Sequence, residues 1–166
     1  MPELIAPTRV LHAAWLDART EWGPGVHEDG FGLLTTDDVD SPAGFAAWVE
    51  RLAGESERCT YRWIIGGDHV LGGIALRHEG NDILPWAGHI GYGIRPSARR
   101  RGLATWALGR MVCEARALGM DRLLAVCEAE NRASAKTIER LGGILEDDAR
   151  HRPVRRYWIG TGEPVI

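Results

Sequence analysis

Three consecutive arginines, Arg99 to Arg101, stand directly before a glycine and an expected helix. A helix N-terminus carries about half a positive charge and up to four unpaired backbone N–H groups, so it normally attracts acidic side chains. Here no Asp or Glu occurs between Ser97 and Val112. Gly102 has no Cβ to shield the amides, and Ala104 and Thr105 place a small side chain and a hydroxyl in the first turn. The pattern predicts a binding site for a diphosphate.

A run of arginines on a protein surface is otherwise most often a solvated charge patch. Its position at a strand-to-helix turn, with Gly102 and Ala104 following, favours phosphate binding here. The sequence contains no G-x-x-x-x-G-K-[ST] motif, and the Gly-Tyr-Gly at 91–93 does not continue into G-x-G-x-x-G. Both common nucleotide-binding motifs are therefore excluded.

The surrounding pattern predicts an α/β fold with a mixed sheet. A glycine-rich turn at 66–68 joins two β-rich runs into an antiparallel hairpin, and a strand-helix-strand succession from 89 to 127 implies a right-handed parallel crossover. Helices are expected at 8–19, 41–53, 102–118 and 132–141. Strands are expected at 59–65, 69–76, 89–94, 122–127 and 155–159.

The arginine loop resembles motif A of the GNAT acetyltransferase superfamily, [RQ]-x-x-G-x-[GA], matched by Arg99, Gly102 and Ala104. HIGYGIRPSARRRGLAT is similar to the family's fourth strand and phosphate loop, and AENRASAKTIERLGG to its motif B. The strings GHIGYGIRPS, N-x-x-S, GG and RYWI occur in the order found in bacterial members. The resemblance covers residues 59–160. It implies a GNAT-like fold, with a mixed, mostly antiparallel sheet whose central parallel strands splay apart between flanking helices.

The resemblance also implies acetyl-CoA as the cosubstrate, with its pyrophosphate in the arginine loop and its pantetheine arm between the fourth and fifth strands. The amide of Tyr92 would face the thioester carbonyl and that of Ile94 the pantetheine. Asn131 would both cap the last helix and contact the cofactor arm. The residues expected to bind acetyl-CoA are Tyr92, Ile94, Arg99, Arg100, Arg101, Gly102, Leu103, Ala104, Thr105, Asn131 and Ser134.

Direct attack of an amine on a thioester requires a proton acceptor, and two residues are candidates. His89 occupies the strand position where many family members carry a Glu, and imidazole titrates near neutral pH. A single His at a strand start is otherwise most often structural. Glu128, just past the strand of Cys127, is the rival base, and it is otherwise a solvated loop acid.

The proton donor is where the sequence departs from the family. Many members carry a Tyr seven residues after the motif B Asn, and that position is Ile138 here. Ser134 and Tyr157 are candidate donors, although Ser134 also suits a helix cap and Tyr157 a packed strand. A thiolate leaves without much help, since the pKa of a thiol is about 8.5. Cys127 ends an apolar strand and is expected to be structural.

The acceptor is not specified by these motifs. Some tryptophans outside the phosphate motif are expected to line its pocket, although core packing is the commoner role: Trp15, Trp22, Trp48, Trp63 and Trp86. Acidic residues around the first loop would attract a cationic amine, although such residues are usually solvated: Glu21, Glu28, Asp29, Asp37 and Asp38.

At 166 residues, with net charge −3 and pI ≈ 6.1, the chain fits one domain and has no global positive field for nucleic acid or membrane. Residues 1–58 would form N-terminal helices and an acceptor-side loop, and residues 59–160 the acetyl-CoA core. No apolar run is long enough to span a bilayer, so a cytoplasmic protein is expected. Three cysteines in no metal spacing indicate reduced thiols and no metal site.

These observations predict an acetyl-CoA-dependent N-acetyltransferase acting on a primary amine of a small molecule. The alternatives are transfer to a protein N-terminus or lysine, and a non-catalytic module that binds acyl-CoA. Because GNAT proteins are often dimers, a homodimer is also an expectation of the resemblance.

Overall fold

The computed structural model describes residues 1–24, 27–146 and 153–162. Across these ranges a seven-stranded sheet runs in the order β1-β2-β3-β4-β5-β7-β6. Every neighbouring pair is antiparallel except β4 and β5, which confirms a mixed, mostly antiparallel sheet. The strands are β1 (Glu3–Ile5), β2 (Cys59–Gly66), β3 (His69–Arg77), β4 (Ile90–Ile94), β5 (Arg122–Glu128), β6 (Ile144–Leu145) and β7 (Val154–Gly160).

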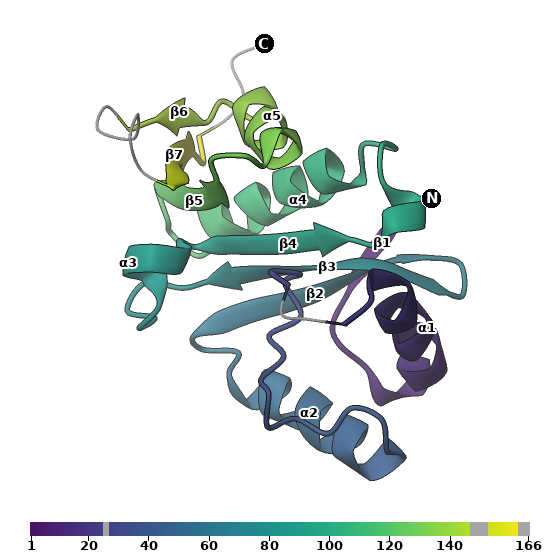
Figure 1. The fold of residues 1–166 in the computed structure, drawn as a ribbon. Helices are drawn as coiled ribbons and strands as arrows, with labels where there is room; N and C mark the ends of the chain where they lie inside the picture. Colours follow the sequence, from purple (N-terminus) through teal and green to yellow (C-terminus); the bar gives the residue numbers. More distant parts are fainter. Residues whose placement is uncertain (25–26, 147–152, 163–166) are drawn as a thin grey trace.

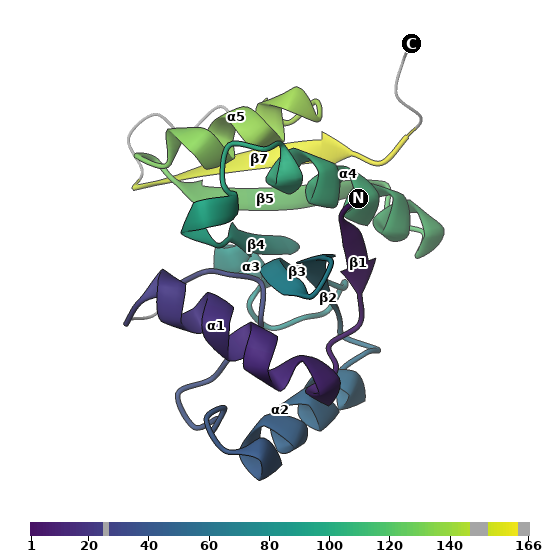
Figure 2. The ribbon, with the colours of Figure 1, turned by 90° about the vertical axis from the view of Figure 1, so that its right-hand side faces the viewer.

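Helices cover both faces of the sheet. Figures 1 and 2 show α4 and α5 on one face and α1 and α2 on the other. The helices are α1 (His12–Trp22), α2 (Pro42–Gly54), α3 (Leu84–Ala87), α4 (Leu103–Ala117) and α5 (Arg132–Arg140), with 3-10 turns η1 (Arg9–Leu11) and η2 (Pro96–Ala98). None of those in the described ranges is long and apolar enough to cross a bilayer.

The expected caps are present where sequence chemistry places them. Ser41 accepts a hydrogen bond from the amide of Gly44 at 3.0 Å and opens α2, with Pro42 in its first turn. Asn131 caps α5 by accepting from the amide of Ser134 at 3.1 Å. Thr8 caps only the short η1, since its side chain accepts from Val10, and the α-helix that follows starts at His12.

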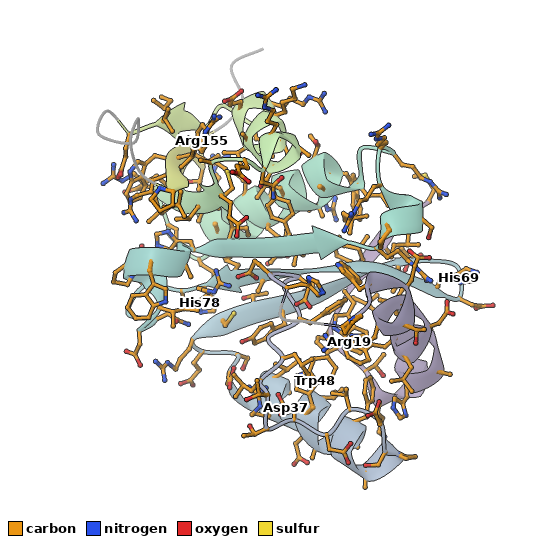
Figure 3. All side chains as sticks on the ribbon, viewed as in Figure 1. Arg19, Asp37, Trp48, His69, His78 and Arg155 are labelled. Carbon is orange, nitrogen blue, oxygen red and sulfur yellow. The ribbon has the colours of Figure 1, made fainter. Side chains whose placement is uncertain are left out.

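Each face of the sheet has its own core. Aliphatic side chains of α4 and α5 pack on one face, among them Leu108, Met111 and Ile138, all fully buried. On the other face, α1 and α2 bury an aromatic cluster in which the rings of Trp15 and Trp48 lie 4.9 Å apart. Figure 3 labels Trp48 on α2, on the side that faces the sheet. Burial of side chains of this size stabilises a fold by about 1.5–3 kcal/mol each.

Three elements were not predicted from the sequence. β1 and β6 are only three and two residues long, and α3 has four residues between the strands expected at 69–76 and 89–94. Short elements of this kind are fixed by pairing or packing with distant residues rather than by a local hydrophobic period.

Candidate active site

The two parallel strands meet at one point and then diverge. β4 and β5 pair only at Ile90 and Ala125, next to a bridge between Gly88 and Ala125. Figure 1 shows β4 and β5 separating toward their C-terminal ends, with α4 and α5 above them. A cavity of about 1220 Å³ occupies this wedge.

The hydrogen-bonding pattern of β3 and β4 determines which amides face the wedge. Arg77 donates its amide to the carbonyl of His89 at 2.6 Å, and Arg95 donates to that of Leu71 at 2.8 Å. Because antiparallel pairing alternates, residues 91 and 93 bond toward β3, whereas residues 92 and 94 point the other way. The amides of Tyr92 and Ile94 therefore face the diverging side of β4.

The arginine loop lies at the far end of the same cavity. Gly102 has a left-handed backbone with φ of 75°, and a Cβ there would meet nothing within 4 Å. The first turn of α4 contains no acidic residue, and Gly102 offers no side-chain cap. Arg100 also has a positive φ, 63°, which is uncommon for a residue with a side chain. This cradle of uncapped amides fits a diphosphate.

The three arginines are placed differently. Arg99 donates its Nε to the carbonyl of Ile94 at 2.9 Å, and it lines the cavity together with Arg100. Arg101 instead donates to the carbonyl of Ser97 at 3.2 Å and does not line the cavity. Of the other residues expected at this end, Leu103, Ala104 and Thr105 line it as well.

Two hydroxyls meet inside the wedge. The hydroxyl of Tyr92 lies 2.7 Å from that of Ser134, and both residues line the cavity beside Cys127. Burial raises the pKa of Tyr92 to about 12, against the opposing effect of its hydrogen bond to Ser134. Burial also raises the pKa of the Cys127 thiol, which is consistent with a structural cysteine.

His89 lies at the closed end of the wedge. Its Nδ1 accepts the amide of Leu124 at 2.8 Å, so its Nε2 carries the hydrogen that points to Glu79, 2.9 Å away. Its own amide donates to the carbonyl of Leu124 at 2.8 Å. The ring is 5% exposed and does not line the cavity. These contacts hold β4 and β5 together and leave neither ring nitrogen free to accept a proton.

The other two candidate catalytic residues, Glu128 and Tyr157, lie in different surroundings. Glu128 is exposed at the end of β5 and lines the cavity. Tyr157 on β7 is 1% exposed in the aliphatic core, where its hydroxyl donates to Glu139 at 2.8 Å, and it does not line the cavity. The structure therefore brings Ser134 and Glu128 into one cavity and places His89 and Tyr157 outside it.

The side of the cavity opposite α4 is formed by the end of α1, the loop after α1, and α3. Trp22, His27, Glu28 and Trp86 line it. The other three tryptophans considered from the sequence are buried in the aromatic core: Trp15, Trp48 and Trp63.

Comparison with known proteins identifies the family. The sequence profile of the acetyltransferase (GNAT) domain matches residues 11–144. The chain is a member of this family. No curated protein matches the sequence. As a GNAT acetyltransferase, the protein uses acetyl-CoA as its acetyl donor.

Solved GNAT structures share the fold at low sequence identity. RimJ from Mycobacterium smegmatis, in complex with CoA-disulfide, is 19% identical with a TM-score of 0.73, over 96% of this chain and 81% of that chain. The microcin C7 self-immunity acetyltransferase MccE, in complex with acetyl-CoA and AMP, is 15% identical with a TM-score of 0.69, over 96% and 92%. A Salmonella typhimurium enzyme that modifies the N-terminal serine of ribosomal protein L7/L12 is 16% identical with a TM-score of 0.68, over 96% and 94%.

Sequence reasoning did not identify one feature of this GNAT site. The side chain of Tyr92 contacts Ser134, 42 residues further along the chain, while Ile138, at the usual Tyr position, is fully buried in the core. The signal available in the sequence was the strand alternation, which puts the Tyr92 side chain on the same face as Ile90 and Ile94, toward α4 and α5.

Proposed function

We propose that the protein is an N-acetyltransferase that moves the acetyl group of acetyl-CoA to a primary amine of a small molecule by direct attack. One observation carries the proposal: a single continuous cavity joins the arginine loop to the carboxylates of Glu28 and Glu128. An anionic cofactor and a cationic amine would thus enter the same space from opposite ends.

The acetyl-CoA contacts follow from the backbone. The amides at the start of α4, with Arg99 and Arg100, would hold the pyrophosphate, because the uncapped helix end favours an anion. The amide of Tyr92 would polarise the thioester carbonyl, and that of Ile94 would pair with the pantetheine. Asn131, which lines the cavity, would contact the same arm.

Two protons must move during the reaction. Glu128 would take one proton from the ammonium and release it to solvent, which leaves a neutral amine to attack the thioester carbon. The C–N bond then forms, the C–S bond breaks, and the thiolate takes the second amine proton through Ser134. Tyr92, in contact with that hydroxyl, would hold the proton path in place.

Two other functions remain to be separated from this one by experiment. Transfer to a protein N-terminus or lysine would use the same donor site, and one solved structure with this fold is that of an enzyme that modifies the N-terminal serine of ribosomal protein L7/L12. A non-catalytic acyl-CoA-binding module is disfavoured by the hydroxyl pair at the thiol end of the wedge.

The test is release of CoA thiol from acetyl-CoA in the presence of polyamines, aminoglycosides, amino acids, simple aryl and alkyl amines, and short peptides, with mass spectrometry of the products. Acetylation of a small amine well above that of any peptide supports the proposal. Acetylation of peptides alone would assign a protein substrate, and acetyl-CoA binding without any thiol release would indicate a binding module.

A further inference from the structure

The loop after α1 packs directly on the backbone of β3 and β4. It can do so because glycines occupy the facing strand positions: a Cβ at Gly73 would lie 2.6 Å from the ring of Phe31, and one at Gly93 would lie 2.8 Å from the Cα of Asp29. A Cβ at Gly91 would overlap Oε1 of Glu28. The carboxylate of Glu28 therefore rests on the residue that precedes Tyr92.

A buried arginine fixes this carboxylate. Arg77 is 7% exposed, and its Nη1 donates to the carbonyls of Ala87 and Gly88, each at 3.3 Å. Its Nη2 donates to Oε2 of Glu28 at 3.0 Å, while the amide of Gly30 donates to Oε1 at 3.3 Å. A carboxylate offers about four lone-pair sites, so these two bonds leave acceptor capacity. The Glu28 side chain is 57% exposed, and the residue lines the cavity.

Glu128 lies on the same face of the sheet, across the wedge. Ile90 pairs with Ala125, and Tyr92 and Cys127 belong to or pack on the aliphatic core on the α4 side. Because side chains alternate along a strand, Glu128 points to the opposite face, where Glu28 rests. On its α1 side the cavity is thus lined by the carboxylates of Glu28 and Glu128, with Arg77 buried behind Glu28. The cations that line the cavity come from the arginine loop and α5: Arg99, Arg100, Lys136 and Arg140.

Two indoles line the same cavity as these carboxylates. Trp22, at the end of α1, approaches Gly93, since a Cβ there would lie 3.0 Å from its ring. Trp86 on α3 lines the cavity and remains 66% exposed. Indole faces pack against apolar groups and also attract cations. The exposure of the Trp86 indole is explained if the acceptor has an apolar part that covers it.

We infer that Glu28, positioned by Arg77, binds the ammonium group of the acceptor, and that the acceptor is an amine with an apolar body and no carboxylate beside the amino group. The inference rests on the proposed function and specifies the substrate class. An α-carboxylate on the acceptor would lie next to Glu28 and Glu128, and these like charges would repel it. Decarboxylated aryl amines are therefore favoured over the matching amino acids.

The experiment compares phenethylamine with two probes that each differ from it in one feature. Phenylalanine carries an added α-carboxylate, and ethylamine lacks the aryl group. For the wild-type protein, kcat/KM for phenethylamine should exceed that for phenylalanine and for ethylamine by at least about tenfold each. Glu28→Gln should raise the KM for phenethylamine roughly tenfold to a hundredfold with little change in kcat, because it removes binding common to ground and transition states. The preference over phenylalanine should shrink in the same variant.

Glu50→Gln is the matched control, since it makes the same change at an exposed position of α2 that does not line the cavity. The thermal shift caused by acetyl-CoA should be the same in wild type and both variants, which shows that folding and donor binding are intact. An unchanged KM for phenethylamine in Glu28→Gln, or equal use of phenylalanine by the wild type, would overturn the inference while amine acetylation itself stands. Absence of acetylation with every amine of the broad panel would instead refute the proposed function.

Discussion

The hydroxyl of Tyr92 on β4 lies 2.7 Å from the hydroxyl of Ser134 on α5, and the contact closes one wall of the wedge. The pair lines the cavity beside Cys127. Ile138 stands at the position where many family members carry the motif B tyrosine, and it is buried in the core. Because burial raises the pKa of Tyr92 to about 12, its phenol keeps its proton throughout the neutral range. The two hydroxyls therefore provide a protonated group at the place where the proposed site puts the CoA thiol.

Removal of this pair should slow the chemical step. Ser134→Ala is expected to lower kcat by roughly tenfold or more, with little change in the KM for acetyl-CoA, because a positioned hydroxyl speeds the step by protonating the thiolate, although the thiolate can still leave without it. Tyr92→Phe should have a smaller effect, since Ser134 still carries a proton. Steady-state kinetics at saturating amine measures both. Equal rates in wild type and Ser134→Ala would show that the thiolate is protonated by water.

The pH dependence separates Glu128 from His89. His89→Ala leaves the amide of Leu124 without its acceptor, so it should destabilise the fold by about 1–3 kcal/mol while the acidic limb of the pH–rate profile persists. Glu128→Gln should flatten that limb with little effect on stability, since the residue is exposed. If instead His89→Ala flattened the acidic limb and Glu128→Gln left it unchanged, His89 would be the base.

Asp29 should make stability depend on pH. Burial raises the pKa of this carboxyl from 3.8 to about 6, with a smaller opposing effect from the amide of Phe31. Between these two values the native state holds more protons than the unfolded chain, so the free energy of unfolding falls as pH rises through the window. Asp29→Asn should therefore raise the free energy of unfolding at pH 8 by up to about 2–3 kcal/mol and have little effect at pH 4.

Urea unfolding at both pH values measures the Asp29 effect. Asp68→Asn, in the exposed turn between β2 and β3, serves as the control and should show no such difference between the two pH values. A stability curve of Asp29→Asn that runs parallel to the wild-type curve at all pH values would contradict the prediction.

Two glycines that flank α4, one before its start and one after its end, allow the proposed phosphate site to be tested against a matched position. Gly102 and Gly119 both have positive φ, 75° and 82°, and a Cβ at either would meet nothing within 4 Å. Alanine at each should cost about 1 kcal/mol of stability through backbone strain. Only Gly102→Ala should weaken the thermal shift caused by acetyl-CoA, because Gly102 lines the cavity and Gly119 does not. Equal shifts in the two variants would place the pyrophosphate elsewhere.

Much of the part of the protein that is expected to bind acetyl-CoA could be predicted from local sequence. The expected helix at 102–118 is observed as Leu103–Ala117, and the expected strand at 122–127 as Arg122–Glu128, because a clear apolar period and glycine punctuation specify both. Motif A predicts the phosphate loop, and Arg99, Gly102 and Ala104 of that motif line the cavity. Asn131 was identified as a cap from its position alone and has that contact.

The part of the cavity that is proposed to bind the acceptor amine depends on contacts between residues far apart in the sequence. Arg77 and Glu28 are 49 residues apart, and no local pattern predicts that a charged residue ending β3 is buried against the loop after α1. The environment of His89 depends on Leu124, 35 residues away, whose amide donates to Nδ1 of the imidazole that the sequence suggested for catalysis. The residue types in the sequence indicate which chemistry is possible. Only tertiary packing determines which of these residues reach the cavity.

A crystal structure of the complex with acetyl-CoA tests the central claim most directly. It should place the pyrophosphate on the amides that begin α4, the pantetheine between β4 and β5, and the thioester carbonyl on the amide of Tyr92. Acetyl-CoA bound outside the wedge, or oriented with its thioester away from Tyr92 and Ser134, would contradict the account.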